Sequence, residues 1–257
     1  MALAGRKVLV VGAGTRPSPE PDPPPGNGRA IAVRAAAQGA ALALADVDEA
    51  SARRTAELVH EAGGRTAPVV VADLADPDAC TELVERAAVE LEGLDGVVLN
   101  AGIGAGRGLA GTSVAEWDAV LAVNLRAHFL VLQAALPKLG EGGSVVLISS
   151  VAALRPGSNV PAYDASKAAQ LGLARHAARE AAPRGVRVNT VAPGLIDTPL
   201  GRLATGGRPE RAATRIPLGR QGTAWEVADA VTFLLSDAAG YVTGPVLAVV
   251  GGLSTIA

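Results

Sequence analysis

Residues 143–167 read GSVVLISSVAALRPGSNVPAYDASK. The run 143–148 is apolar and rich in β-branched residues, which favours a strand buried in a parallel sheet. Ser158 and Asn159, followed by Pro161, predict a helix start, because cap-forming side chains and a first-turn proline are typical of helix N-termini. The stretch therefore predicts a strand, a loop and a helix, in that order.

The same stretch carries three polar side chains suited to carbonyl chemistry. Tyr163 and Lys167 are four residues apart, so their side chains share one face of the helix. An ammonium there favours the tyrosinate and predicts a lowered pKa for the phenol. Ser150, at the carboxyl end of the strand, lies beside them if the loop folds back. The three groups can polarise a carbonyl and pass it a proton, although a Tyr-x-x-x-Lys pair alone is also common on helices without a catalytic role.

The composition limits the fold and the partners. The chain has 257 residues, of which 49% are hydrophobic but only 2% are aromatic, so its core must be built from Ala, Val and Leu. We find no linker and no internal repeat, and predict a single domain over residues 1–257. The formal net charge of −2 gives no reason to expect nucleic acid or an anionic membrane as a partner.

Cysteine content and hydropathy bear on the compartment. The single cysteine, Cys80, excludes an internal disulfide and fits a reducing environment. We find no apolar run of about 18 residues, so no membrane span is expected. The chain begins almost at once with the strand-like run 6–11 rather than with a signal peptide. We therefore expect a cytoplasmic protein, and no metal site is predicted.

Strand-like runs alternate with helical runs along the whole chain. The predicted strands are 6–11, 41–46, 67–72, 95–100, 143–149, 186–192 and 245–250. The predicted helices are near 28–39, 49–63, 77–92, 114–139, 161–182 and 224–236. Strands joined by helical crossovers predict a seven-stranded parallel sheet covered on both faces. Right-handed crossovers then give a doubly wound, Rossmann-type α/β fold, with ligands at the carboxyl ends of the strands.

A glycine-rich turn follows the first predicted strand. Gly12 and Gly14 end that strand, and Gly26, Asn27 and Gly28 open the next helix. Small residues at such a turn let a pyrophosphate approach the helix N-terminus. The turn therefore predicts a site for the phosphates of a dinucleotide.

The next strand ends carry candidate contacts for the rest of a dinucleotide. Asp46 can accept hydrogen bonds from a ribose diol and repels a 2′-phosphate, which favours NAD over NADP; a solvated turn or a helix cap is the alternative. Asp73, followed by Leu74, can accept a hydrogen bond from an adenine amino group, or can belong to the helix cap at 76–78. Small residues that let a flat ring lie against the backbone end the fourth strand: Asn100, Ala101 and Gly102.

Residues 15–25, the proline-rich segment, interrupt the glycine-rich turn. They read TRPSPEPDPPP, and six of the eleven are proline, which predicts an extended and fairly stiff flap. Three interpretations stay open: a surface decoration, a cover over the adenosine end of the cofactor, or a contact with another subunit. Arg16 could also offset Asp46 and admit a 2′-phosphate, so NADP stays open as well.

Two later stretches add polar candidates. Asn124 lies inside a predicted helix, where asparagine is unfavourable, so we expect an inward-facing side chain with hydrogen-bond partners. After the sixth strand, Pro193 and Gly194 end the strand sharply and Thr198 offers a hydroxyl. The stretch from about 198 to 222 is rich in Gly, Pro and Arg with little periodicity, which predicts a lid over the site.

Taken together, these residues resemble the short-chain dehydrogenase/reductase family over essentially the whole chain. The spacing of thirteen positions from Ser150 to Tyr163 also follows the family pattern. Four departures concern the cofactor: Val11 replaces a threonine, thirteen residues rather than three separate Gly12 from Gly26, Asn27 replaces an apolar residue, and Val250 stands where aspartate is frequent. The resemblance rests on an ordered set: the glycine-rich turn, Asp73, Asn100-Ala101-Gly102, Asn124, Ser150, Tyr163, Lys167, Pro193-Gly194 and Thr198.

The resemblance implies a role for each site residue. Tyr163 would be the general acid/base, Lys167 would lower its pKa and hold the nicotinamide ribose, and Ser150 would orient the substrate oxygen. Asn124 would hold a water that links Lys167 to solvent, and Asn100 would steady the fourth strand. Thr198 and the backbone near Ile196 would meet the nicotinamide carboxamide.

The implied activity is hydride transfer between a nicotinamide cofactor, NAD or NADP, and a small-molecule secondary alcohol or ketone. Two alternatives stay open: a redox-neutral epimerase or dehydratase with a tightly held cofactor, and a cofactor-sensing scaffold without activity. The family also implies a homotetramer, with a dimer as the alternative, packed through the helices near 114–139 and 161–182.

Overall fold

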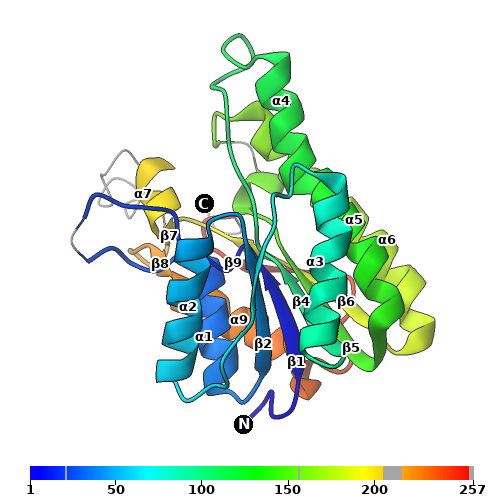
Figure 1. Cartoon of the computed structure of the whole chain (residues 1–257). Coiled ribbons are helices and arrows are strands. Elements are labelled where there is room, and N and C mark those ends of the chain that lie inside the picture. The colour runs from blue at the N-terminus through cyan, green and yellow to red at the C-terminus, as the bar shows by residue number, and fades with distance from the viewer. Residues whose placement is uncertain (21, 156, 205–215, 255–257) are drawn as a thin grey trace.

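A seven-stranded parallel sheet forms the centre of the computed structural model, which describes residues 1–20, 22–155, 157–204 and 216–254 (Figure 1). The strand order is β3-β2-β1-β4-β5-β6-β9. Strands are added on one side of β1 up to β3 and on its other side from β4 onwards, so the winding direction reverses between β1 and β4. This switch point is where doubly wound sheets bind ligands. The strands are β1 (Lys7–Val11), β2 (Ala41–Asp46), β3 (Val69–Val71), β4 (Leu94–Leu99), β5 (Leu139–Ile148), β6 (Arg187–Pro193) and β9 (Val246–Val249).

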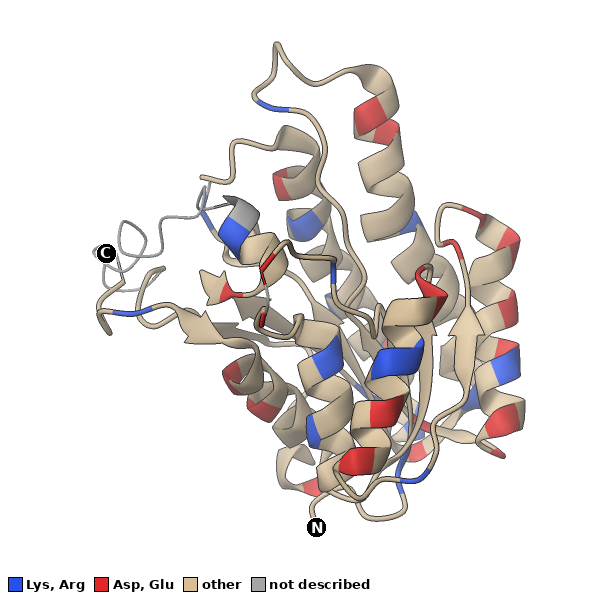
Figure 2. Ribbon diagram, turned by 60° about the vertical axis from the view of Figure 1, so that its left-hand side comes forward, with Lys and Arg blue, Asp and Glu red and all other residues tan. Residues whose placement is uncertain are grey.

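Helices cover both faces of the sheet. One face carries α1 (Asn27–Ala37), α2 (Glu49–Glu61) and α9 (Ala224–Leu235), and the other carries α3 (Pro77–Glu90), α5 (Ala127–Ala135) and α6 (Pro161–Ala181) (Figure 1). The predicted Rossmann-type α/β fold is therefore confirmed. Acidic and basic residues are interspersed along the outer helices (Figure 2), in keeping with the small net charge of −2.

Alternation along the strands divides the apolar residues into two cores. In β1, Val8 and Val10 pack towards α1 and α9, whereas Leu9 and Val11 pack towards α3 and α5, because successive strand side chains point to opposite faces. Among the described residues, the buried hydrophobic set consists of Ala, Val, Leu, Ile and one Cys, without an aromatic ring. The prediction of an aliphatic core is confirmed.

Most predicted element boundaries lie within two residues of those observed, with one region of exception. The predicted helix 114–139 is divided into α4 (Val114–Leu121), a π-helical turn (Ala122–Arg126), α5 and a 3₁₀ turn (Leu136–Lys138). The strand β5 then begins at Leu139 rather than at 143, with a register shift against β4. Such irregularities depend on tertiary packing and leave little periodic signal.

The region 114–138 also differs from the expectation on hydropathy. Val114–Lys138 is long and apolar enough to cross a membrane by length and composition alone. In the fold, α5 packs against α3, and α4 packs against α6. Only part of the stretch is used in the core, because Val114 and Phe129 are 76% and 47% exposed.

The predicted lid at 198–222 is described only in part. It starts with α7 (Pro199–Ala204), and its last residues form β8 (Gly222–Thr223), which pairs in parallel with β7 (Ile196–Asp197). Residues 205–215 lie outside the described residues. The short β7–β8 pair ties both ends of the stretch to the carboxyl end of β6.

Candidate active site

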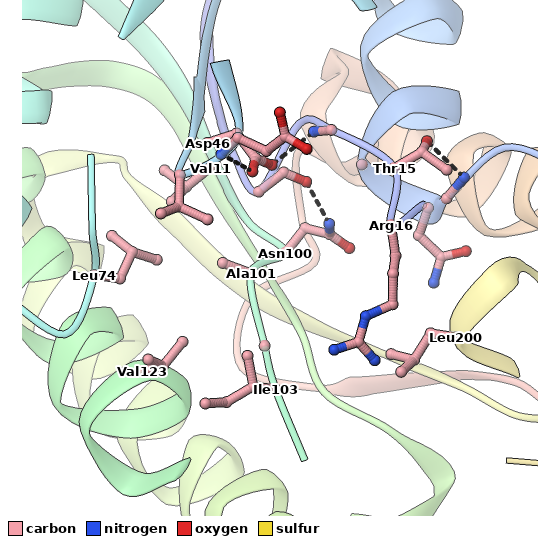
Figure 3. A pocket seen from close by; sticks show the side chains of 18 of the residues that line it. Val11, Thr15, Arg16, Asp46, Leu74, Asn100, Ala101, Ile103, Val123 and Leu200 are labelled. Atoms are coloured by element: carbon pink, nitrogen blue, oxygen red, sulfur yellow. Dashed lines mark hydrogen bonds between the residues drawn. The ribbon is translucent and has the colours of Figure 1, made fainter. Parts of the chain in front are cut away.

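A cavity of about 590 Å³ lies at the carboxyl ends of the central strands, where the fold predicts ligand binding. Most residues predicted to contact the cofactor line it: Gly12, Gly14, Gly26, Asn27, Gly28, Asp46, Asp73, Leu74, Asn100, Ala101, Gly102, Tyr163, Lys167 and Thr198. Five predicted site residues do not line it: Asn124, Ser150, Pro193, Gly194 and Ile196. Figure 3 shows this cavity with several of its side chains.

Close backbone approach explains the glycines of the turn. A Cβ on Gly28 would lie 1.8 Å from the carbonyl oxygen of Gly12, which no side chain could tolerate. Gly12 has a φ of +81°, and a Cβ there would lie 2.6 Å from the Ala101 nitrogen. The side chain of Asn100 donates to the Gly12 oxygen at 2.7 Å. Asn100 therefore fixes the glycine-rich turn against the end of β4.

The turn stays closed although the proline-rich segment interrupts it. Thr15 N donates to Ser51 Oγ at 2.7 Å, and Ser51 Oγ donates to Thr15 O at 2.9 Å. The nitrogen of Gly26 then donates to Thr15 Oγ1 at 3.0 Å. Thr15 therefore joins the start of the segment to its end and to α2. We call Thr15, Ser51 and Gly26 the Thr15 clamp, and no residue spacing in the sequence indicates it.

Asp46 lies where the sequence predicts a ribose contact. One carboxylate oxygen accepts from Gly14 N at 2.8 Å and the other from Asp48 N at 3.0 Å. The N-cap of α2 is Asp48 rather than Asp46, so the alternative role as a helix cap does not apply. Because a carboxylate has about four acceptor positions, Asp46 keeps capacity for a ligand in the cavity.

Asp73 also lacks the alternative role as a helix cap. Its Oδ1 accepts from Ala75 N at 2.9 Å, while the N-cap of α3 is Asp76, which accepts from Asp78 N. Asp73 is thus free of the capping role and lines the cavity.

Lys167 lies almost fully buried at the other end of the cavity, with 3% of its surface exposed. Its Nζ donates to Ile148 O at 2.9 Å, at the end of β5, and lies 5.6 Å from the centroid of the Tyr163 ring. Burial lowers the pKa of Lys167 from 10.5 to about 7. The predicted juxtaposition of phenol and amine is therefore observed, and the pKa of the amine lies near neutral pH.

The pKa of Tyr163 differs from the expectation. The sequence predicted that Lys167 lowers it, but burial of the phenol, the largest cause, raises it above 10.0. The neighbouring Ser150 hydroxyl acts in the lowering direction, and the Asp164 carboxylate adds to the rise. The expectation failed because burial disfavours the charged tyrosinate more than the neighbouring groups favour it.

Asn124 is completely buried and fully hydrogen-bonded, as its position inside a helix predicted. Its Oδ1 accepts from Ile103 N at 2.8 Å, and its Nδ2 donates to Ile103 O at 2.9 Å and to Ser166 Oγ at 3.0 Å. It belongs to the π-helical turn, a feature often found at functional sites. The side chain therefore holds the chain just beyond Gly102 against α6.

Comparison with known proteins agrees with this geometry. The model of a family described as enoyl-(acyl carrier protein) reductase matches residues 25–254. The 3-oxoacyl-[acyl-carrier-protein] reductase of Thermotoga maritima is 39% identical over 209 residues, covering 80% of this chain and 85% of that protein. A short chain dehydrogenase from Burkholderia cenocepacia J2315, solved in complex with NADP, aligns with a TM-score of 0.90 and 34% identity over 99% of this chain and 100% of that chain. This chain belongs to the short-chain dehydrogenase/reductase family.

As a member of the short-chain dehydrogenase/reductase family, the protein is an oxidoreductase that acts on alcohol or ketone substrates with a nicotinamide cofactor. A further relative, the (3R)-3-hydroxyacyl-CoA dehydrogenase of Homo sapiens, is 37% identical over 218 residues, covering 81% of this chain and 84% of that protein. The family match begins at residue 25, so residues 15–24 lie outside it.

The residues at the turn fit such a cofactor. Gly26, the N-cap of α1, provides no side-chain cap, so the first N–H groups of α1 are available for an anion. Asn27 Oδ1 is buried without a hydrogen-bond partner among the described residues. The glycine cradle, Asp46 and Asp73 would hold the pyrophosphate and the adenosine, while Lys167 and Thr198 would meet the nicotinamide end.

Sequence reasoning missed two buried polar residues behind Asn124. Gln170 Nε2 donates to Asn124 O at 2.6 Å and contacts His128 Nδ1 at 2.9 Å, and His128 Nε2 contacts Ala101 O at 3.1 Å. Because Gln170 Nε2 can only donate, His128 Nδ1 accepts and its Nε2 carries the proton. Burial and Lys167 lower the pKa of His128 to about 3, so the imidazole is neutral. One signal in the sequence could have found them: both are polar residues at helix positions where an apolar residue is expected.

Proposed function

We propose that this protein transfers a hydride between a nicotinamide cofactor and a secondary alcohol or ketone, with Tyr163 as the general acid/base. The observation that carries the proposal is the arrangement at the end of β5. The phenol of Tyr163, the Ser150 hydroxyl and the buried amine of Lys167 converge there. Tyr163 and Lys167 line one end of the cavity, and the glycine-rich turn and Asp46 line the other.

The position of each residue in the site determines its proposed role. The cofactor would give or accept the hydride, and the protein supplies orientation and gives or takes the proton. Ser150 lies where it can donate to the substrate oxygen beside the phenol. A Tyr163 phenol with a raised pKa is protonated at neutral pH, which suits proton donation to the oxygen of a carbonyl as it is reduced. Lys167, with a pKa of about 7, can return a proton to the tyrosine side of the site.

We further propose NAD as the preferred cofactor. Asp46 ends β2 and lines the cavity, and a carboxylate at this position favours a ribose diol and repels a 2′-phosphate. The Burkholderia dehydrogenase was solved with NADP, so the preference is argued only from the residues of this chain. Among the described residues, no ion pair neutralises Asp46, and two backbone N–H groups hold its carboxylate in place.

The decisive experiment is the variant Tyr163→Phe, assayed with a panel of secondary alcohols and ketones by the absorbance of reduced nicotinamide. Removing the proton donor should lower kcat by about 10³-fold, while the Kd for NADH, from nicotinamide fluorescence, changes by less than about 3-fold. Tyr241→Phe is the matched control, because Tyr241 is fully exposed and lies outside the cavity lining. Activity of Tyr163→Phe within about tenfold of wild type would contradict the proposal.

A further inference from the structure

The proline-rich segment places one cation inside the dinucleotide cavity. Arg16 lines the cavity, and in Figure 3 its side chain points towards Leu200 and away from Asp46. Among the described residues, neither a hydrogen bond nor an ion pair engages its guanidinium. The segment therefore contributes an available guanidinium to the middle of the cavity rather than to its adenosine end.

The charges that line the cavity make this cation significant. Three carboxylates, Asp46, Asp48 and Asp73, face two cations, Arg16 and Lys167. Lys167 lies at the catalytic end and already donates to a carbonyl oxygen. A pyrophosphate carries two negative charges and meets a chain whose net charge is −2, so a local cation adds to its attraction.

The position of Arg16 matches the path of a pyrophosphate. With the adenosine at Asp46 and the nicotinamide at Tyr163, the phosphates cross the uncapped N-terminus of α1, which attracts anions. Arg16 lines the same cavity and belongs to the segment that joins the turn to α1. A guanidinium presents a fork of N–H donors that matches phosphate oxygens.

We propose that Arg16 binds the pyrophosphate of the cofactor, so that the proline-rich segment is part of the dinucleotide site. The inference rests on the proposed use of a nicotinamide dinucleotide. It assigns Arg16 to the phosphates that NAD and NADP share, rather than to the 2′-phosphate that only NADP carries.

Two attachments hold the segment in place for this role. The Thr15 clamp fixes its base to α2 and to the start of α1. Farther along, Glu20 forms an ion pair with Arg202 of α7, and Arg202 in turn pairs with Asp197 at 2.6 and 2.9 Å. The segment therefore runs from the glycine-rich turn to α7. Its prolines limit backbone freedom, which lowers the entropy cost of holding Arg16 over the cavity.

The test compares Arg16→Gln with wild type by fluorescence titration of NADH and of NADPH, without any substrate. Loss of the guanidinium should raise both dissociation constants by a similar factor of about 10, and it should weaken their dependence on salt. Arg86→Gln is the matched control, because Arg86 is exposed on α3 outside the cavity and the charge change is the same. Its dissociation constants should equal those of wild type.

Three results would overturn the inference. Unchanged NADH binding by Arg16→Gln would show that Arg16 does not meet the cofactor. A loss confined to NADPH would assign Arg16 to the 2′-phosphate instead. If wild type itself binds neither NADH nor NADPH, the proposed function fails together with the inference, whereas the first two results leave the proposed function intact. Titration with ADP-ribose and with adenosine localises the contact, because only ADP-ribose should lose affinity in Arg16→Gln.

Discussion

The two ends of the cavity are built in different ways. At the catalytic end, Lys167 and Asn124 are buried, and their polar atoms are held by hydrogen bonds from β5, α6 and the chain after β4. At the cofactor turn, Arg16 and Glu20 are exposed, and the backbone is held by the side chains of Thr15 and Asp46. Both ends line the same cavity.

This difference has a physical cause. A buried polar group without a partner costs about 1–3 kcal/mol, so Lys167 and Asn124 are compatible with the core only in one arrangement. An exposed loop has no such constraint, because water satisfies its polar groups. The cofactor turn can therefore accommodate the proline-rich segment, provided that a few bonds such as the Thr15 clamp close it again.

The largest effect should come from Lys167→Met, which keeps the bulk of the side chain and removes its charge. Without the amine beside Tyr163, kcat should fall by about 10³-fold. The variant leaves the cofactor turn untouched, so the Kd for ADP, which lacks the nicotinamide ribose, should stay within about 3-fold of the wild-type value. A variant that retained a tenth of wild-type activity would show that the catalytic end does not depend on its buried amine.

The same variant reports the cost of burying a lysine. The pKa of Lys167 is about 7 in the folded protein and about 10.4 in an unfolded chain. Between these values the unfolded chain binds the extra proton, so wild type gains stability as pH rises from about 7 to about 10. The difference between the Tm of Lys167→Met and that of wild type should therefore be most positive below about pH 7. It should fall as pH rises to about 10. Thermal unfolding followed by circular dichroism at several pH values measures the difference, and a constant difference in Tm would contradict it.

The comparison also explains what the sequence could predict. The doubly wound parallel sheet, the aliphatic core and the pairing of Tyr163 with Lys167 follow from periodicity and residue spacing, which burial enforces. The raised pKa of Tyr163 did not follow, because it depends on how deeply the phenol and the amine are enclosed. The His128–Gln170 pair did not follow either, because its partners come from elements distant in sequence.

The cofactor turn was predicted less completely. The glycines at 12 and 28 were recognised from their residue type alone, and close backbone contacts account for them. The Thr15 clamp joins residues 36 positions apart through a single hydroxyl, and no local pattern marks such a contact. The direction of the Arg16 side chain was also open in the sequence, which allowed a contact with Asp46 that the structure does not contain.

A smaller effect should follow from replacing residues 15–25 with a single serine. The change leaves three residues between Gly12 and Gly26, and the fold should persist, with a cooperative thermal transition. The Kd for NADH should rise by about 10-fold, because Arg16 is removed together with the ion pair from Glu20 to Arg202. If the replacement raises the Kd for NADH no more than Arg16→Gln does, the segment acts through the Arg16 guanidinium alone. An unchanged Kd would leave the segment as a decoration or a subunit contact.

The smallest effect should come from Ser51→Ala, which opens the Thr15 clamp without altering charge. Ser51 exchanges two hydrogen bonds with the backbone of Thr15, so its loss frees the base of the segment. Because Ser51 lies in the first turn of α2, where alanine has a good helix propensity, the Tm should change by only a few degrees.

The Kd for NADH should rise by about 2- to 3-fold, since a mobile segment holds Arg16 over the cavity for less of the time. Ser18→Ala is the control, because in the described part of the chain Ser18 Oγ accepts only from Glu20 N, within the segment itself. If Ser51→Ala binds NADH as wild type does, the bonds of Asp46 and Asn100 to the turn are sufficient, and the cofactor end is as well determined by its backbone as the catalytic end is by its buried side chains.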